Sequence, residues 1–120
     1  MGYRSDVAIG LTDHATRLLH AIATHEDSEL CQLLQDAQGG WPGKSANIAK
    51  DPSDQSVVLY WESIKWYDDF PEISMMKNFL ESIPPSNYRF IRLGEENDDT
   101  EEHGDYYDAE IWITRSISWG

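Results

Sequence analysis

Cysteine is nearly absent from this chain. Cys31 is the single cysteine among 120 residues, so neither an internal disulfide nor a zinc site built from several cysteines can form. A fold that does without disulfides is typical of a reducing compartment. Cys31 falls on the apolar side of an expected helix, which favours a small buried side chain over a reactive thiol.

Basic residues are scarce as well. Nine lysines and arginines stand against 22 aspartates and glutamates, which gives a formal net charge of −13 at pH 7. Direct nucleic-acid binding needs many lysine or arginine contacts to phosphate, so the composition argues against it. A negative surface instead attracts a partner that has a basic surface and speeds their encounter.

Long apolar runs are missing. No segment approaches the roughly 18 apolar residues of a membrane span. The opening MGYRSDVAIGL lacks the basic region and apolar core of a signal peptide. We therefore expect a cytoplasmic protein without membrane contact.

Motifs of known enzyme chemistry are incomplete. GGWPGKS, residues 39–45, resembles a phosphate-binding loop, but Gln38 stands where that loop needs its first glycine. No two histidines have the helical spacing of a zinc site. Asn97, Asp99 and Glu101 alternate as calcium ligands do, but Glu102 occupies the glycine position of that motif. We expect no enzymatic activity, no cofactor and no metal.

Apolar residues make up 40% of the chain and include five Trp and six Tyr, which is enough for the core of a single domain over residues 1–120. Their periodicity predicts strands at 6–11, 56–66, 88–93 and 109–117, helices at 13–23 and 71–83, a further helix through Leu30 and Ala37, and a short strand at 45–49. We expect an α+β fold, a mostly antiparallel sheet with helices on one face, ferredoxin-like with an added C-terminal strand.

The same periodicity predicts which side chains are buried. Trp61 and Trp66 are an odd number of residues apart, so a regular strand would place them on opposite faces of the sheet. The expected core residues are Val7, Ile9, Leu18, Leu19, Ile22, Ile73, Met76, Leu80, Ile91, Ile111 and Ile113.

The segment GEENDDTEEHGD, residues 94–105, contains seven carboxylates and no lysine or arginine. We expect it to connect two strands, and three interpretations stay open: a solvated connection, a metal-binding loop, or a negative surface that occupies the nucleic-acid site of another protein. An extended chain advances roughly 3.3 Å per residue, and each DNA strand carries one charge per roughly 3.4 Å. The charge densities are therefore similar.

Tyrosines follow this segment directly, and they would supply anchors where the carboxylates supply attraction. The candidate partner-binding residues are Glu95, Glu96, Asp98, Asp99, Glu101, Glu102, Asp105, Tyr106, Tyr107 and Asp108.

Three stretches carry a resemblance to a known group: GYRSDVAI at the start, IKWYDDFPEI at 64–73, and YRFIRLGEENDD at 88–99, followed by ITRSI. In this order they resemble small acidic proteins encoded by tailed phages and prophages. The resemblance implies a phage origin and a site of action in the cytoplasm of an infected bacterium. Small acidic phage proteins include inhibitors of host machinery, such as anti-CRISPR proteins.

The resulting hypothesis is a phage-encoded, non-enzymatic binding protein of the anti-CRISPR kind. It would inhibit a host nucleic-acid-binding defence protein or complex by occupying its basic surface. The alternative is a structural or assembly protein of the phage that acts as a homo-oligomer, such as a dimer, through a free C-terminal strand.

Overall fold

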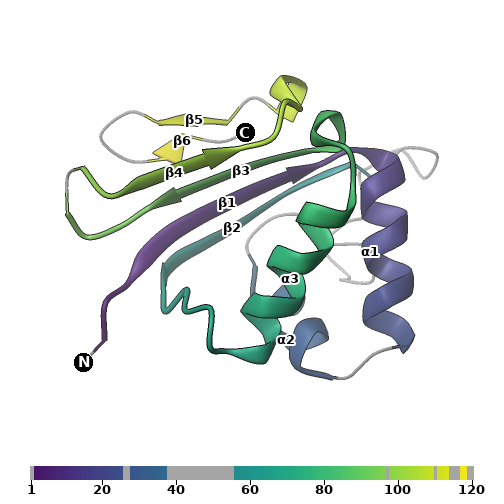
Figure 1. Ribbon diagram of the computed structural model, residues 1–120, viewed down its shortest axis with the longest axis horizontal. Coiled ribbons are helices and arrows are strands. Elements are labelled where there is room, and N and C mark those ends of the chain that lie inside the picture. The colour runs from purple at the N-terminus through teal and green to yellow at the C-terminus, as the bar shows by residue number, and fades with distance from the viewer. Residues whose placement is uncertain are drawn as a thin grey trace.

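A four-stranded antiparallel sheet lies at the centre of the computed structural model (Figure 1). The structure describes residues 2–25, 28–37, 56–96, 98–109, 111–113 and 117–118. The strands lie in the order β2-β1-β3-β4, and their bounds are Ser5–Leu11 for β1, Val57–Ile64 for β2, Tyr88–Leu93 for β3 and Thr100–His103 for β4.

The three described helices cover one face of this sheet (Figure 1). They are α1 (Asp13–His25), α2 (Ser28–Asp36) and α3 (Pro71–Ser82). Thr12 begins α1, because its Oγ1 accepts a hydrogen bond from the backbone N–H of Ala15 at 3.2 Å. Pro71 occupies the first turn of α3, where its missing N–H costs nothing.

The other face of the sheet carries the C-terminal part of the chain. A 3₁₀ turn, η2 (Tyr107–Ala109), leads to the two-stranded pair β5 (Trp112–Ile113) and β6 (Ile117–Ser118). Ala109 and Ile111 pack on this face against Ala8 and Ile91. Gly10 allows the close approach, because a Cβ there would collide with the Cβ of Ala109.

The α+β class is confirmed: an antiparallel sheet with helices on one face. The ferredoxin-like plan stays a prediction. The predicted strand 109–117 is wrong, because Ala109 ends a 3₁₀ turn and β5 pairs with β6 rather than with the main sheet. The edge position belongs to β4 instead. The predicted strand 45–49 lies outside the described residues.

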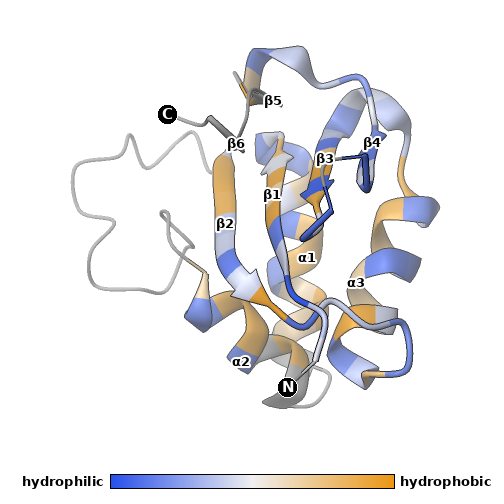
Figure 2. Cartoon of the chain, turned by 90° about the vertical axis from the view of Figure 1, so that its left-hand side faces the viewer, coloured by the Kyte–Doolittle hydropathy of each residue, from blue (hydrophilic) through white to orange (hydrophobic). Residues whose placement is uncertain are grey.

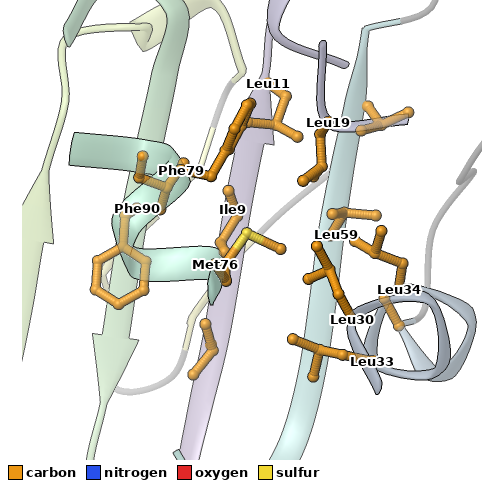
Figure 3. Packing of buried hydrophobic residues seen from close by; sticks show 14 of the residues in the cluster. Ile9, Leu11, Leu19, Leu30, Leu33, Leu34, Leu59, Met76, Phe79 and Phe90 are labelled. Carbon is orange, nitrogen blue, oxygen red and sulfur yellow. The ribbon is translucent and has the colours of Figure 1, made fainter. Parts of the chain in front are cut away.

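The main core lies between the sheet and the helices (Figure 3). Side chains from alternate positions of β1 and β2 meet α1, α2 and α3 there. The predictions of burial are confirmed for Val7, Ile9, Leu19, Ile73, Met76, Leu80, Ile91 and Ile111. The side chains of Cys31 and Ile113 are not among those that the structure describes.

Two predictions of burial on α1 are wrong, since Leu18 is 39% exposed and Ile22 is 37% exposed. The helix instead buries the stripe that contains Ala15, Leu19 and Ala23. These residues recur every four positions, and two of them are small, so α1 can lie close to the sheet. The sequence contains both stripes, and packing selects the one with the smaller side chains.

Trp61 and Trp66 lie in the same core, with ring centroids 5.7 Å apart, so the prediction of opposite faces is wrong. Regular alternation ends between them, because β2 stops at Ile64 and Ser63 has a left-handed φ of 55°. Asp6 accepts a hydrogen bond from the Ser63 N–H at 2.9 Å, which helps to hold this conformation. The chain then returns Trp66 to the helix side.

Candidate functional site

The acidic segment is part of a β-hairpin rather than a loose connection. The Gly94 N–H donates to the Asp99 carbonyl at 2.8 Å and closes a turn. Thr100 to His103 then pair with β3, with Glu101 opposite Arg92 and Glu102 opposite Ile91. We name β3, this turn and β4 the acidic hairpin (residues 88–103); its turn and β4 are strongly hydrophilic in Figure 2.

Arg92 of β3 forms ion pairs with two of the carboxylates. Its guanidinium donates to both oxygens of Asp99, at 2.7 and 3.2 Å, and to Glu101 at 2.5 Å. It also donates to the hydroxyl of Ser5 at 3.0 Å. The Arg92 side chain is only 14% exposed. Arg92 is therefore a mostly buried cation with a charged or polar partner on each side.

Arg89 neutralises a third carboxylate on the opposite face of the hairpin. It forms an ion pair with Glu102 and donates to the Gly104 carbonyl at 3.1 Å. Its guanidinium also lies 5.0 Å from the ring centre of Tyr107, in a cation–π contact. Side chains alternate along a strand, so Arg92 pairs with a carboxylate on one face of β4 and Arg89 pairs with one on the other face.

These contacts change the acidity of the groups involved. The hydrogen bond from Arg92, followed by that from Tyr3, lowers the pKa of Asp99. Partial burial of Glu101 acts to raise its pKa, but the hydrogen bond and charge of Arg92 outweigh burial and lower it. The hydrogen bond to Asp99 raises the pKa of Tyr3. Asp99 and Glu101 therefore stay ionised in the folded protein to a lower pH than ordinary carboxyl groups.

The opening segment binds the acidic hairpin directly. The Tyr3 hydroxyl donates to Asp99 at 2.6 Å, and the Arg4 backbone N–H donates to Glu95 at 2.6 Å. A Cβ on Gly94 would collide with both the Asp99 carboxylate and the Tyr3 hydroxyl, so a larger residue at position 94 would displace these side chains from their present contact. Two of the stretches that carry the phage resemblance therefore contact each other.

Two carboxylates of the turn face solvent. Glu96 and Asp98 are exposed, and their side chains form no hydrogen bond or ion pair with any other residue in the described part of the chain. We name Glu96 and Asp98 the open carboxylates, and Asp99, Glu101 and Glu102 the paired carboxylates. The turn that carries the open pair is held on both sides of it, at Glu95 and at Asp99.

The remaining candidate residues lie beyond the other end of β4. Asp105, Tyr107 and Asp108 are exposed there, and Tyr107 is 67% exposed. Tyr106 is partly buried against the core of the second face. The structure thus divides the ten candidate residues among a turn, a paired strand and a separate acidic end around Tyr107.

Sequence reasoning missed the two arginines of β3. They were visible in YRFIRL, but the residues opposite them were assigned to a loop, so no cross-strand pairing was expected. Recognising that GEENDD turns the chain would have placed TEEH beside YRFIRL and Glu101 opposite Arg92.

Within the described residues, no three His, Cys, Asp or Glu side chains come together as metal ligands would. None of the described helices has the length and apolar character to cross a membrane. Comparisons of the chain with protein-family models, curated proteins and solved structures find no match. A functional argument therefore starts from the geometry of the acidic hairpin.

Proposed function

We propose that this protein binds a basic surface of a bacterial nucleic-acid-binding protein and blocks the nucleic-acid site there, without enzymatic activity. The observation that carries the proposal is the division of the acidic hairpin. Glu96 and Asp98 are exposed, and their side chains have no ion-pair partner among the described residues. Arg89 and Arg92, in contrast, form ion pairs with the carboxylates of β4 and with Asp99.

A held turn suits the open carboxylates to binding. Tyr3 and the Arg4 backbone fix the turn at Asp99 and Glu95. Binding then costs less conformational entropy than it would for a free acidic tail. The net charge of −13 adds a long-range attraction for a basic partner and increases the association rate.

The paired carboxylates limit how this surface can imitate DNA. Glu101 and Glu102 point to opposite faces of β4, and each is bound to an arginine. Residues 94–105 therefore do not form a continuous row of free charges. The proposed contact is a cluster at the turn, supported by the net charge of the molecule, rather than a copy of the phosphate backbone.

The phage resemblance supports the choice of partner class, a host defence protein in the bacterial cytoplasm, by analogy alone. The alternative role is a homo-oligomeric phage structural protein that pairs with its copies through a C-terminal strand. In the described residues Trp112 and Ile113 pair with Ser118 and Ile117 of the same chain, so pairing between copies would use an outer edge of this two-stranded sheet.

The test begins with capture of partners from a bacterial lysate on the immobilised protein. The captured partner is then assayed for nucleic-acid binding with and without the protein. We expect the complex to lose nucleic-acid binding. The proposal is wrong if the partner keeps its nucleic acid in the complex, or if capsid and tail proteins are captured instead.

A charge-matched pair of variants locates the contact. Glu96→Gln with Asp98→Asn should slow association about two- to tenfold at low salt, and less at high salt. Glu62→Gln with Asp69→Asn removes the same charge from exposed positions elsewhere and should have a smaller effect.

A further inference from the structure

A cavity of about 200 Å³ lies between α3 and the acidic hairpin. Leu80 of α3 and Phe90 of β3 provide its apolar surface, and the ring of His103 stacks on Phe90 with centroids 5.7 Å apart. Glu81 and Glu101 also line it, together with Lys77. The cavity is therefore apolar in part and has charged residues from both elements at its wall.

The cavity lies beside a free sheet edge. β4 is the last strand of its sheet, so the side of β4 away from β3 has no neighbour among the described strands. Hydrogen-bonded and non-hydrogen-bonded pairs alternate along an antiparallel pair. The Gly94 N–H donates to the Asp99 carbonyl. Counting two residues further along each strand, the alternation makes Arg92 and Glu101 a hydrogen-bonded pair and Ile91 and Glu102 a non-hydrogen-bonded one. The N–H and C=O of Glu102 consequently point to the open edge.

A strand added at this edge would place every second side chain over the cavity. Glu101 and His103 are the side chains of β4 that line it, and α3 extends over the same face. The neighbouring positions of a new strand would point the same way. A side chain from that strand would enter the cavity that Leu80, Glu81 and Phe90 line.

The charges around the cavity favour a cationic side chain with an apolar stem. Glu81 is exposed and has no ion pair with another described residue. Lys77 also lines the cavity, where its ammonium group is bound to Asp68 at 2.7 Å. Its charge also acts on Glu101, which Arg92 already binds. Glu81 is therefore the acidic side chain of the cavity that an incoming cation would meet. Lysine and arginine combine the required stem and charge, and the aromatic ring of Tyr88, which is partly exposed, adds a surface on which a cation is stabilised.

We infer that an extended, basic segment of the partner pairs with β4 and inserts a lysine or arginine side chain into this cavity. This inference rests on the proposed function and names the second contact of the same partner. A second copy of this chain suits the edge poorly, because antiparallel pairing of two TEEH strands would bring glutamates of both copies together.

The probe is a synthetic peptide, blocked at both ends, that alternates lysine with threonine. The readout is hydrogen exchange of the Glu102 amide in the full-length chain, followed by NMR. A strand at the edge would bond this N–H, so saturating peptide should slow its exchange by about tenfold or more. The same peptide with every backbone nitrogen methylated keeps the charge but has no N–H on either edge to pair with β4, and it should leave the exchange unchanged.

Two pairs of variants separate the backbone contact from the cavity contact. Glu102→Pro and Glu102→Gln both remove the ion pair with Arg89. The proline variant also removes the outward backbone N–H, whereas the glutamine variant keeps it. Only the proline variant should therefore stop peptide binding. Glu81→Gln should weaken the peptide about threefold. Glu72→Gln on the same helix, outside this cavity, should have no effect.

Three results would overturn the inference. In the first, millimolar peptide leaves the exchange rate of the Glu102 amide unchanged but shifts the NMR signals of the Glu96 and Asp98 amides. This result would place the basic peptide at the turn, and the proposed function would still hold. Another is slow Glu102 exchange in the concentrated protein alone, which would place a second copy at the edge. The third is equal binding of the methylated peptide. The proposed function fails separately, when the captured partner keeps its nucleic acid.

Discussion

The turn and the strand of the acidic hairpin carry the same kind of charge in opposite situations. On β4 and at its start, Asp99, Glu101 and Glu102 are bound by two arginines of the neighbouring strand. One residue earlier, Asp98 faces solvent without such a partner among the described residues. The comparison shows that acidic residues adjacent in sequence can do different work, some holding the fold and others remaining available for a partner.

The largest effect on this comparison should come from Arg92→Ala. The change leaves Asp99 and Glu101 without their shared cation, and we expect a loss on the order of 2 kcal/mol in the free energy of unfolding. Denaturant titration measures it. Arg17→Ala is the matched control, because the Arg17–Asp13 pair is solvent-exposed and should contribute less than about 1 kcal/mol. Equal losses for the two variants would mean that Arg92 is only a surface pair.

Gly94→Ala should lower the free energy of unfolding by less than Arg92→Ala does. The new Cβ would occupy the space of the Asp99 carboxylate and the Tyr3 hydroxyl, and the required shift should cost about 1 kcal/mol. Tyr3→Phe provides the test, since it removes the same hydrogen bond. In the Gly94→Ala background, Tyr3→Phe should have little further effect on the unfolding midpoint. Fully additive losses would contradict a shared cause.

The pH dependence should separate the paired carboxylates from the rest. The folded-state pKa values of Asp99 and Glu101 are lowered, so the unfolded chain binds protons first as the pH falls. Their stabilisation is complete above the ordinary values of 3.8 and 4.5 and is lost as the pH falls through the lower folded-state values.

Unfolding measured from pH 6 downward, roughly through the range of carboxyl titration, should show a steeper acid loss in the wild type than in Arg92→Ala. The unpaired carboxylates contribute equally to the pH dependence of both proteins, so their contribution cancels when the two curves are subtracted. Parallel pH curves for the two proteins would mean that Arg92 does not stabilise the ionised carboxylates.

The smallest effect on stability should come from the open carboxylates. Glu96→Gln with Asp98→Asn removes no described ion pair and reduces repulsion within the turn, so the free energy of unfolding should change by less than about 0.5 kcal/mol. Any change should be toward higher stability, and salt should diminish it. A loss above that size would reveal a structural role for the open pair.

Periodicity in the sequence was enough to predict most of the fold. The local pattern of apolar residues predicts the strand at 88–93 and the opening strand. It also predicts the start of the helix at Pro71 and most of the core positions. β4 could not be recognised this way, because TEEH contains no apolar residue. Its pairing depends on Arg89 and Arg92 across the hairpin, and such cross-strand pairs are invisible when each segment is considered alone.

The strand predicted at 109–117 was wrong for a related reason. The residues at 109–117 are rich in strand-forming side chains, yet Ala109 belongs to a 3₁₀ turn that rests on Gly10. A distant glycine that makes room for an alanine leaves no periodic signal. The candidate carboxylates were likewise predicted as one group, and the contacts of Arg89 and Arg92 divide them into paired and open ones.

The most direct test compares two double variants that remove the same charge within the acidic hairpin. One replaces the open pair, Glu96→Gln with Asp98→Asn, and the other replaces two paired carboxylates, Asp99→Asn with Glu101→Gln. For each, the unfolding midpoint is measured together with the association rate for the captured partner at low and moderate salt. We expect the open variant to have the unfolding midpoint of the wild type and a lower association rate. We expect the paired variant to have a lower unfolding midpoint and a smaller reduction of the association rate. Equal association rates for the two variants, or an unchanged midpoint in the paired one, would contradict the division of the acidic hairpin.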